Sequence, residues 1–405
     1  MNSNVPPSNE MDDSPLYPSF SLKFSYPLCF TRNAFTAENL TFVREVKGNH
    51  KGAMPKLQFF IDQGVLDANP ELANAITEYC HVHELNLVDA VHPVPGGEAA
   101  KNQIQIDAIY DLMLAAGMDR QSFIVAIGGG GVLDAVGYAA STFHRGMRLI
   151  RMPTTVLAQN DAGVGVKNGI NSQGIKNLLG CFAVPHAIIN DAAFLDSLSA
   201  RDFRSGFAEA VKVALIRDAE FFFWITQNQQ ALNAREPRAT HHLIKRCAQL
   251  HLNQICLGGD PFEQGSARPL DYGHWSAHKL ESLTKHALSH GEAVAIGMAL
   301  DALYAVEIGL MNQAACDQVL AVIQGLGFSL WDDALISADA QGNSELLVGL
   351  EEFRQHLGGR LCITLLTDIG KTLEASEIDT EALLRARDKL AVQAKRENRL
   401  ARVAG

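Results

Sequence analysis

Short apolar runs that alternate with helical patterns constrain the fold of this chain more than any other feature. Such alternation is typical of a parallel sheet whose two faces are covered by helices. One further half-buried strand is expected at residues 20–26, where apolar and polar residues alternate. The apolar runs of the predicted sheet span residues 57–61, 85–90, 122–127, 149–152 and 187–190.

Helical spacing dominates after about residue 197, over residues 200–226, 238–257 and 292–309. A chain of 405 residues is also too long for one ordinary core, which favours two domains. We therefore predict an α/β fold with an N-terminal, Rossmann-like parallel-sheet domain and a C-terminal α-helical domain. The predicted bounds are residues 1–18 for a polar, disordered tail, 19–197 for the sheet domain and 198–405 for the helical domain.

Composition narrows the class of function. A formal net charge of -11 argues against a nucleic-acid partner, because no basic surplus is present to neutralise phosphates. No apolar stretch approaches the length of a membrane span. The 7 cysteines are scattered without a CxxC pair, which predicts reduced, buried thiols rather than a disulfide framework. The chain is therefore expected to be a cytoplasmic enzyme that acts on a small molecule.

A glycine turn suggests a nucleotide site. The apolar run that ends at Ile127 leads into four glycines, Gly128 to Gly131, and Asp134 follows at the start of an expected helix. Glycines allow close approach of a ligand to the backbone, and a helix N-terminus favours phosphate oxygens. The spacing is not GxGxxG, so a tight turn without a ligand is an equal alternative.

Polar residues after neighbouring apolar runs extend this candidate site. Asp62 follows the run at 57–61, where its carboxylate would bind ribose hydroxyls or cap a helix. Thr154 and Thr155 follow the run at 149–152 and offer hydroxyl groups. Glu98 and Lys101 are candidates as well, although a surface pair at a helix start has the same spacing.

Glu209, His274 and His290 suggest a metal site. One carboxylate and two imidazoles are the set that a catalytic zinc needs, with a fourth position open for a substrate oxygen. The spacing of these residues and their neighbours also fits roles that involve no metal. Glu209 and Lys212 are spaced as a solvated salt bridge, and His274 with His278 is spaced as two histidines on one helix face.

Several cations lie in loops that are rich in glycine and asparagine. Lys167, Lys176 and Asn177 fall in such segments, where long side chains can turn toward an anionic ligand. Exposed loop lysines are the alternative. The same ambiguity applies to Arg145.

Taken together and in order, these segments resemble the sugar-phosphate cyclases, the family that includes 3-dehydroquinate synthase. The resemblance covers roughly residues 57–377. It rests on the stretches PGGEAAK, GGGGVLDAVGYAASTFHRG, RMPTTVLAQNDAGVGVKNGIN, GIKN, RSGFAEAVK, GHWSAH and SHGEAVAIGM.

The resemblance implies a dehydroquinate synthase-like fold, a homodimer, and NAD+ and Zn2+ (with Co2+ as a substitute) as cofactors. It implies zinc ligation by Glu209, His274 and His290. The residues implied around the substrate are Arg145, Asp161, Lys167, Lys176, Asn177, Lys212 and His278. The implied NAD+ contacts come from Asp62, Glu98, Lys101, Gly129, Gly130, Asp134, Thr154, Thr155, Asp161, Lys167 and Lys176.

Departures from the dehydroquinate synthase pattern point to the substrate. Asp271 stands where those enzymes carry Asn. Arg268 and Asp271 form part of a sequence motif similar to that of 2-epi-5-epi-valiolone synthases, which act on sedoheptulose 7-phosphate. A lysine that helps to hold the substrate carboxylate in dehydroquinate synthases has no counterpart in residues 250–255. A buried carboxylate without a cationic partner is costly, so a neutral polyol fits better. His278, in contrast, matches the dehydroquinate synthases.

The expected reaction is therefore ring closure of a seven-carbon sugar phosphate, with Asp271 and Arg268 among the substrate contacts. The resemblance implies transient oxidation by NAD+, elimination of phosphate, reduction and intramolecular aldol closure. The first alternative is 3-dehydroquinate synthase acting on 3-deoxy-arabino-heptulosonate 7-phosphate. The others are a metal-dependent polyol dehydrogenase and a non-catalytic binding homologue.

Overall fold

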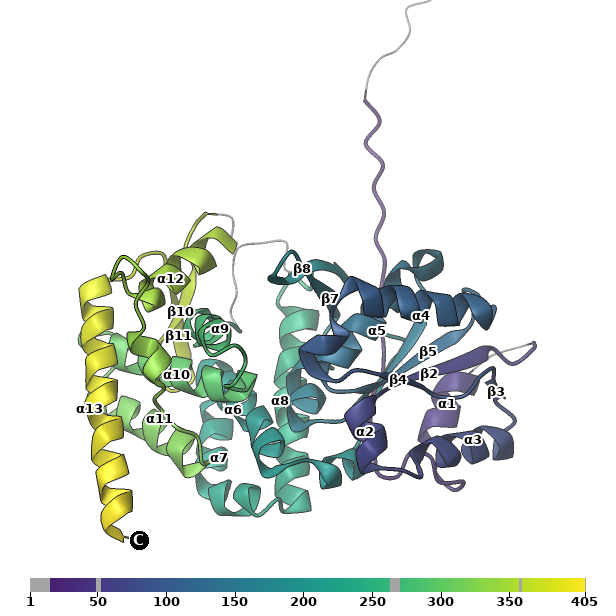
Figure 1. Cartoon of the computed structure of the whole chain (residues 1–405), viewed down its shortest axis with the longest axis horizontal. Coiled ribbons are helices and arrows are strands. Elements are labelled where there is room, and N and C mark those ends of the chain that lie inside the picture. The colour runs from purple at the N-terminus through teal and green to yellow at the C-terminus, as the bar shows by residue number, and fades with distance from the viewer. Residues whose placement is uncertain (1–14, 49–51, 263–269, 357–358, 405) are drawn as a thin grey trace, which may run out of the picture.

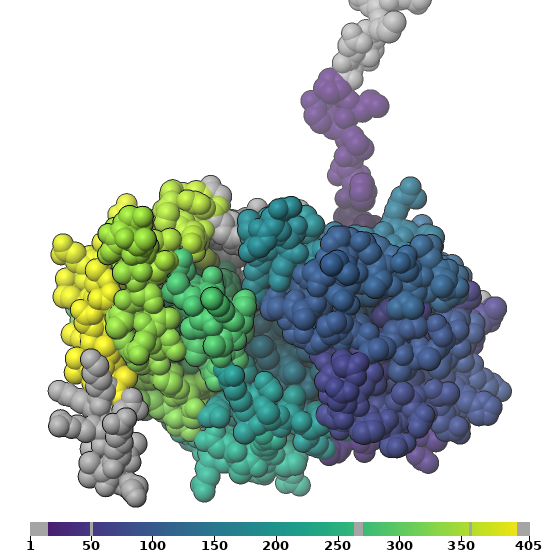
Figure 2. Space-filling view, in the orientation of Figure 1, coloured from purple at the N-terminus to yellow at the C-terminus, as the bar shows by residue number. Residues whose placement is uncertain are grey.

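The computed structural model describes residues 15–48, 52–262, 270–356 and 359–404. Its described residues form a sheet half, which precedes the helix that starts at Ala200, and a helical half beside it (Figure 1). The two halves are also distinct in the space-filling view, in which purple and blue residues lie on one side and green and yellow residues on the other (Figure 2). No helix in the described ranges combines the length and the apolar character that a membrane span requires.

The main sheet has the strand order β1-β9-β6-β5-β2-β3, with β4 pairing beside the end of β2. Every strand pair in it is parallel, which confirms the predicted sheet. The carboxyl ends of parallel strands meet at one edge, where α/β proteins place their ligands. The strands are β1 (Leu28–Thr31), β2 (Lys56–Asp62), β3 (Asn86–Leu87), β4 (His92–Val94), β5 (Phe123–Gly128), β6 (Arg148–Pro153) and β9 (Ala187–Asp191).

Helices cover both faces of this sheet. On one face α1 (Thr41–Lys47) and α3 (Leu72–Val82) bury Phe42, Ile76 and Tyr79 against β2 and β5. On the other face α4 (Gln103–Ala115) and α5 (Gly130–Thr142) form a second apolar layer. Short helices follow β2, β4 and β9, at α2 (Gln63–Ala68), η1 (Gly97–Ala100) and η4 (Ala192–Ser197). The central strands are buried on both sides, which explains their continuous apolar sequence.

The helical half is built around α10 (His290–Glu307), which is apolar on all sides and buried along most of its length. It packs against α6 (Ala200–Arg217), α9 (His274–Leu283), α11 (Gln313–Gly325) and α13 (Thr380–Ala404), and these helices share one large core. A helix of this composition must lie inside a domain. The remaining elements are α7 (Ala219–Asn233), α8 (Pro237–Leu257), η5 (Asp333–Ile336), α12 (Glu345–His356) and the hairpin β10 (Ile363–Asp368) with β11 (Lys371–Ala375).

Two predicted elements are wrong. The alternating segment at 20–26 is not a strand: Phe20 and Phe24 are 85% and 55% exposed, and the chain enters the sheet only at β1. Alternation alone is insufficient because the segment has no strand beside it. The single helix expected at 200–226 is two helices, since Asp218 ends α6 and its side chain caps the first turn of α7.

Other local features differ from expectation. The glycine-rich loops around Lys167 and Lys176 form an antiparallel hairpin of β7 (Lys167–Ser172) and β8 (Ile175–Phe182). The predicted burial of the cysteines is also only partly correct. Cys80, Cys247 and Cys316 are buried, whereas Cys256 is exposed.

Candidate active site

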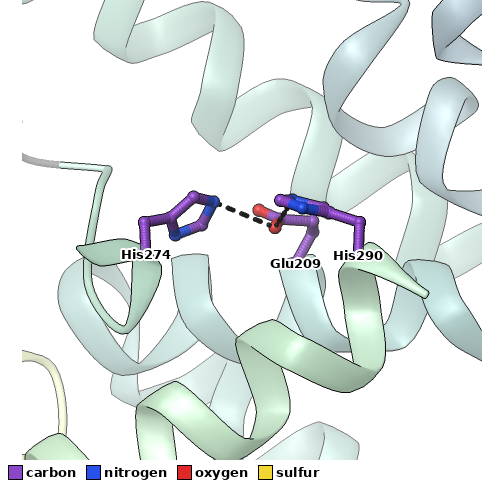
Figure 3. Close-up of side chains that lie close together, drawn as sticks. All are labelled: Glu209, His274 and His290. Carbon is purple, nitrogen blue, oxygen red and sulfur yellow. Dashed lines mark ion pairs between the residues drawn. The ribbon is translucent and has the colours of Figure 1, made fainter. Parts of the chain in front are cut away.

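Three predicted metal ligands come together in the helical half (Figure 3). Glu209 lies on α6, His274 begins α9 and His290 begins α10, so three separate helices supply them. The Nε2 atoms of His274 and His290 lie 3.5 Å and 3.3 Å from Oε1 of Glu209. A ligand atom from each residue lies within 4.8 Å of the others, a spacing that suits one shared metal ion.

The carboxylate of Glu209 fits a metal ligand chemically. It is fully buried, and both of its oxygens lack a well-formed hydrogen bond although Lys212 is in ion-pair contact. Burial opposes its charge, but Lys212 and His274 outweigh that effect and hold the pKa of Glu209 well below its usual range. Burial lowers the pKa of His290, whereas the carboxylates of Glu209 and Glu281 raise it to about 9. Cation binding must therefore displace a proton.

Two glycines set the spacing of the histidine-bearing helices. Gly273 caps α9 with a φ of 76°, and a Cβ atom there would lie 2.7 Å from the backbone nitrogen of Met298. A Cβ on Gly297 would lie 2.0 Å from the carbonyl oxygen of Gly273. Only glycine permits this approach of α9 and α10. At the start of α10, the Ser289 and Glu292 side chains form a capping box beside His290.

Lys212 occupies a strongly acidic environment. Its side chain is 3% exposed, and the carboxylates of Glu209, Asp161 and Asp271 all act on it. Burial lowers the pKa of Lys212, but these three carboxylates outweigh that effect and raise it above its ordinary value. Lys212 is therefore a fixed cation rather than a base.

Asp161 reaches this group from η3, a single turn of π-helix at Ala158–Ala162. Its Oδ1 lies 2.7 Å from Nδ1 of His251 on α8. Sequence reasoning had missed His251, because its partner Asp161 is distant in the sequence. Single π-helical turns often occur at functional sites.

His278 lies one turn after His274 on α9, and its ring stacks at 6.3 Å from that of His290. The side chain is exposed. The surrounding protein and the imidazoles of His274 and His290 nevertheless lower its pKa, so the ring is neutral near pH 7.

The predicted nucleotide residues gather at the carboxyl ends of β2, β5 and β6. Gly129 caps α5, and a Cβ on Gly131 would lie 2.4 Å from the carbonyl oxygen of Gly97. Gly130 is the first residue of α5 and lies close to Ala162 of η3. Asp62 faces this turn and caps α2 by accepting a hydrogen bond from Gly64. Its role as a helix cap is therefore present, and it does not exclude a role toward a ligand.

The remaining nucleotide candidates border the same turn. Thr154 donates its backbone N–H to the Gly128 carbonyl, and the methyl group of Thr155 packs near Gly129. The side chain of Lys101 is 3% exposed and lies 2.7 Å from Asp134. These contacts tie the first turn of α5 to the segment that follows β4.

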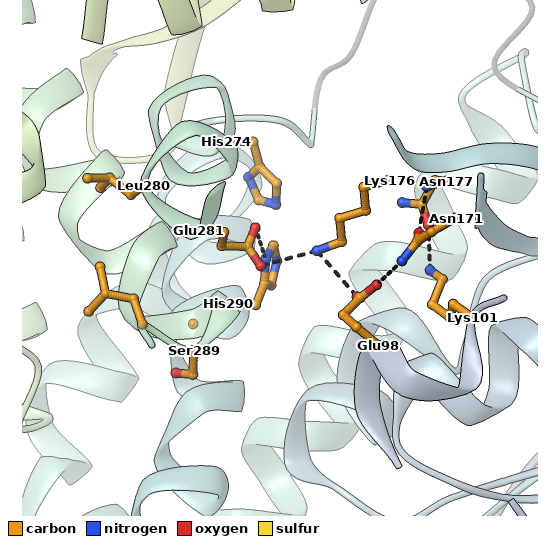
Figure 4. Close-up of polar contacts among 12 residues, drawn as sticks. Glu98, Lys101, Asn171, Lys176, Asn177, His274, Leu280, Glu281, Ser289 and His290 are labelled. Carbon is orange, nitrogen blue, oxygen red and sulfur yellow. Dashed lines mark hydrogen bonds and ion pairs between the residues drawn. The ribbon is translucent and has the colours of Figure 1, made fainter. Parts of the chain in front are cut away.

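A polar network joins this segment to the β7–β8 hairpin and to α9 (Figure 4). Asn171 donates to Glu98 at 2.6 Å, and Lys101 contacts the side chain of Asn177. Lys176 reaches Glu98 at 3.5 Å and Glu281 at 3.2 Å. The predicted loop residues therefore connect the two halves.

Arg151 and Glu281 were missed at the sequence level. Arg151 is fully buried on β6 and donates to the carbonyls of Gly165 and Lys167, which fixes the strand that Lys167 begins. An arginine inside an apolar run gives no signal of such a role. Glu281 was predictable, because it follows His274 by two helical turns and therefore shares its face.

The contacts described above test neither of two further predicted substrate residues, Arg145 and Arg268. Arg145 is exposed in the turn after α5, and the structure joins it to no other described residue by a hydrogen bond or ion pair. Arg268 lies outside the described residues. Both remain predictions.

Comparison with known families matches most of this architecture. The 3-dehydroquinate synthase N-terminal family model matches residues 91–205, and the C-terminal model matches residues 206–345. Together they cover more than half of the chain, and their junction falls within α6.

Individual relatives carry two different activities. The chain is 35% identical to a 3-dehydroquinate synthase from Bartonella quintana, over 73% of this chain and 79% of the relative. It is 34% identical to a 2-epi-5-epi-valiolone synthase from Streptomyces glaucescens, over 75% and 77%. A similar solved structure is 2-epi-5-epi-valiolone synthase from Streptomyces hygroscopicus subsp. jinggangensis 5008 with NAD+ and Zn2+ bound. It has a TM-score of 0.82 at 27% identity and covers 93% of this chain and 100% of that one. The chain therefore belongs to the sugar-phosphate cyclases of the 3-dehydroquinate synthase-like superfamily, carbon–oxygen lyases that act on phosphates.

Proposed function

We propose that this cyclase acts on sedoheptulose 7-phosphate, a neutral seven-carbon sugar phosphate, and releases phosphate to give a valiolone-type cyclitol. NAD+ and zinc are its proposed cofactors. The solved valiolone synthase with both groups bound supports this assignment, as does the Glu209, His274 and His290 set.

The observation that carries the proposal is the excess of negative charge around Lys212. Glu209, Asp161 and Asp271 all act on this one ammonium group, and Asp161 also has His251 beside it. A zinc ion would neutralise Glu209, so Asp161 and Asp271 remain beside Lys212, and a substrate carboxylate placed here would be a third negative group. Like charges at such a distance repel, and an unpaired buried charge is costly. The hydroxyl groups of a polyol instead supply hydrogen-bond donors to these carboxylates.

The residues present fit both cofactors. Glu209, His274 and His290 would hold the metal, and Asp62, the turn at Gly129 and the threonines after β6 would hold NAD+. When bound, these groups supply a Lewis acid and a reversible hydride acceptor.

The side chains of this protein do the rest. Lys212 keeps its proton and neutralises negative charge that develops on a substrate oxygen. His278, with a neutral ring, has one nitrogen that accepts a proton. Lys167, Lys176 and Asn177 lie on the β7–β8 hairpin and would bind the phosphate group, which prefers ammonium and amide donors.

The substrate preference can be measured directly. The purified protein with NAD+ and Zn2+ is offered sedoheptulose 7-phosphate or 3-deoxy-arabino-heptulosonate 7-phosphate, and released phosphate and product mass are followed. We expect phosphate release from the sugar to exceed that from the acid by at least about a hundredfold, since an uncompensated buried charge costs several kcal/mol. NADH should not accumulate.

Asp271→Asn sharpens this test. The variant removes one of the three carboxylates around Lys212. The ratio of phosphate release from the sugar to phosphate release from the acid should therefore decrease. Phosphate from the acid alone would contradict the proposal and identify a divergent 3-dehydroquinate synthase, consistent with the relative from Bartonella quintana. Accumulation of NADH without phosphate release would contradict ring closure altogether.

We also propose that the protein is a homodimer that pairs through β8. Ile175, Leu178, Leu179 and Phe182 on this strand are 55%, 46%, 41% and 42% exposed. Among the described residues β8 pairs with β7 alone, so its other edge is open. Residues 177–182 carry no charge that would discourage edge-to-edge pairing. The same edge of a second copy fits, because a two-fold axis places identical strands antiparallel.

Charges on this strand should separate the dimer. The double variant Leu178→Lys/Leu179→Lys is expected to reduce the mass in light scattering after size exclusion from twice 44.0 kDa to 44.0 kDa. Ile104→Lys, at a residue on α4 that is 78% exposed, is the matched control and should remain a dimer. A double variant that stays dimeric would place the interface elsewhere.

A further inference from the structure

The outward-facing nitrogens of the two metal-set histidines have different partners. Both rings direct Nε2 at Glu209. Nδ1 of His274 lies 3.2 Å from the backbone carbonyl of Tyr272, whereas Nδ1 of His290 lies 3.3 Å from Oε2 of Glu281. A histidine that binds a metal through one nitrogen normally donates its other N–H to such an acceptor, which fixes the tautomer and the orientation of the ring.

Glu281 is built into this position. It lies on α9 two turns after His274, and its side chain is 6% exposed. The contact therefore joins α9 to the first residue of α10. His290 is the more exposed of the two histidines, with a side chain that is 27% exposed against 10% for His274, so its ring depends more on this carboxylate.

A cation accompanies the buried carboxylate. Nζ of Lys176 lies 3.2 Å from Oε1 of Glu281, while Oε2 faces His290 (Figure 4). Lys176 also lies 3.5 Å from Glu98, on the nucleotide side of the site. A carboxylate with two such partners stays ionised despite its burial.

We propose that Glu281 is a positioning residue for the metal site, which holds His290 in the orientation that binds the ion, and that Lys176 acts on the metal through Glu281. This inference rests on the metal set of the proposed function, but it assigns roles outside that set. Neither residue would touch the ion.

Metal affinity tests the inference without any substrate. The dissociation constant for Zn2+ is measured by competition with a chromophoric chelator, with no sugar phosphate or NAD+ present. Glu281→Leu removes both the acceptor and the charge, and we expect binding to weaken by about 10- to 100-fold. Glu281→Gln keeps an acceptor at the same position and should weaken it by less. Equal dissociation constants for Glu281→Leu and the unaltered chain would overturn the proposal.

Two controls separate positioning from damage to the fold. Glu352→Gln removes a carboxylate on α12 that lies 3.0 Å from Nζ of Lys279, a residue on the same helix as Glu281. The Zn2+ affinity of this variant should not change. The Co2+-loaded protein gives a second signal, because its visible absorption reports the ligand geometry. Glu281→Leu should alter that spectrum, while its circular dichroism should match that of the unaltered chain. An unchanged Co2+ spectrum would show that Glu281 does not fix the orientation of the His290 ring.

The role of Lys176 is tested by combining variants. Lys176→Met alone should weaken Zn2+ binding a few-fold, and the double variant Lys176→Met/Glu281→Leu should bind no more weakly than Glu281→Leu. Full additivity would show that Lys176 acts independently. If the unaltered chain bound no metal at all, the proposed function would fail instead, so the two failures are distinguishable.

Discussion

Glu209→Gln is expected to lower the turnover of the sugar phosphate by about a thousandfold and to abolish tight Zn2+ binding. A Lewis acid contributes several kcal/mol to a barrier of this kind, and each 1.36 kcal/mol is a factor of ten in rate. The amide keeps the shape of the side chain but carries no charge, so Lys212, His274 and His290 lose their common anion. Phosphate release and chelator competition measure the two effects.

The control for this variant is Glu220→Gln, at an exposed carboxylate on α7. It should match the unaltered enzyme in both measurements. Treatment of the unaltered enzyme with a strong chelator should reproduce the loss of turnover. Added Zn2+ should restore the turnover of the chelator-treated enzyme but not that of Glu209→Gln. Zn2+ affinity should also increase with pH up to about 9, because the proton on His290 competes with the ion below that pKa. A Glu209→Gln enzyme that kept its metal would disprove this ligand assignment.

Lys212→Met is expected to reduce kcat by about a hundredfold to a thousandfold while Zn2+ still binds. The loss is the size observed when one preorganised charge or donor is removed from an active site. Methionine has a similar length and suits a side chain that is 3% exposed. Metal binding should be equal or tighter, since a cation next to the ion has been removed.

Lys371→Met serves as the control, because that lysine side chain is 71% exposed and lies on β11. Assays at saturating Zn2+ reduce the destabilisation that follows when Glu209 loses its cation. Unchanged kcat in Lys212→Met would remove this residue from the chemistry. A loss of kcat together with the metal would instead make it a support for Glu209.

The parts of the fold that sequence predicts well are those with local causes. Strands β2, β5, β6 and β9 lie within one or two residues of their predicted bounds, since a central parallel strand must be apolar throughout. The segment at 20–26 has a suitable pattern but no neighbouring strand, and pairing is a tertiary property. The β7–β8 hairpin was hidden by its glycines and asparagines, which are equally typical of loops.

The site divides in the same way. Glu209, His274 and His290 were found because each lies in a distinctive local stretch, RSGFAEAVK, GHWSAH and SHGEAVAIGM respectively. His251 and Arg151 were missed because their roles depend on partners that are distant in sequence, Asp161 on η3 and the carbonyl groups after it. No periodicity or spacing on α8 or β6 encodes those partners.

The close approach of Gly273 and Gly297 has a consequence for enzyme engineering. Even an alanine at either position would push α9 away from α10, and with it His274 away from His290. A library designed to broaden substrate range should therefore leave both codons untouched, although neither residue is a proposed metal, cofactor or substrate ligand. In a deep mutational scan these two glycines should be as intolerant as the metal ligands themselves. Proximity to the substrate would be a poor guide to which positions can vary.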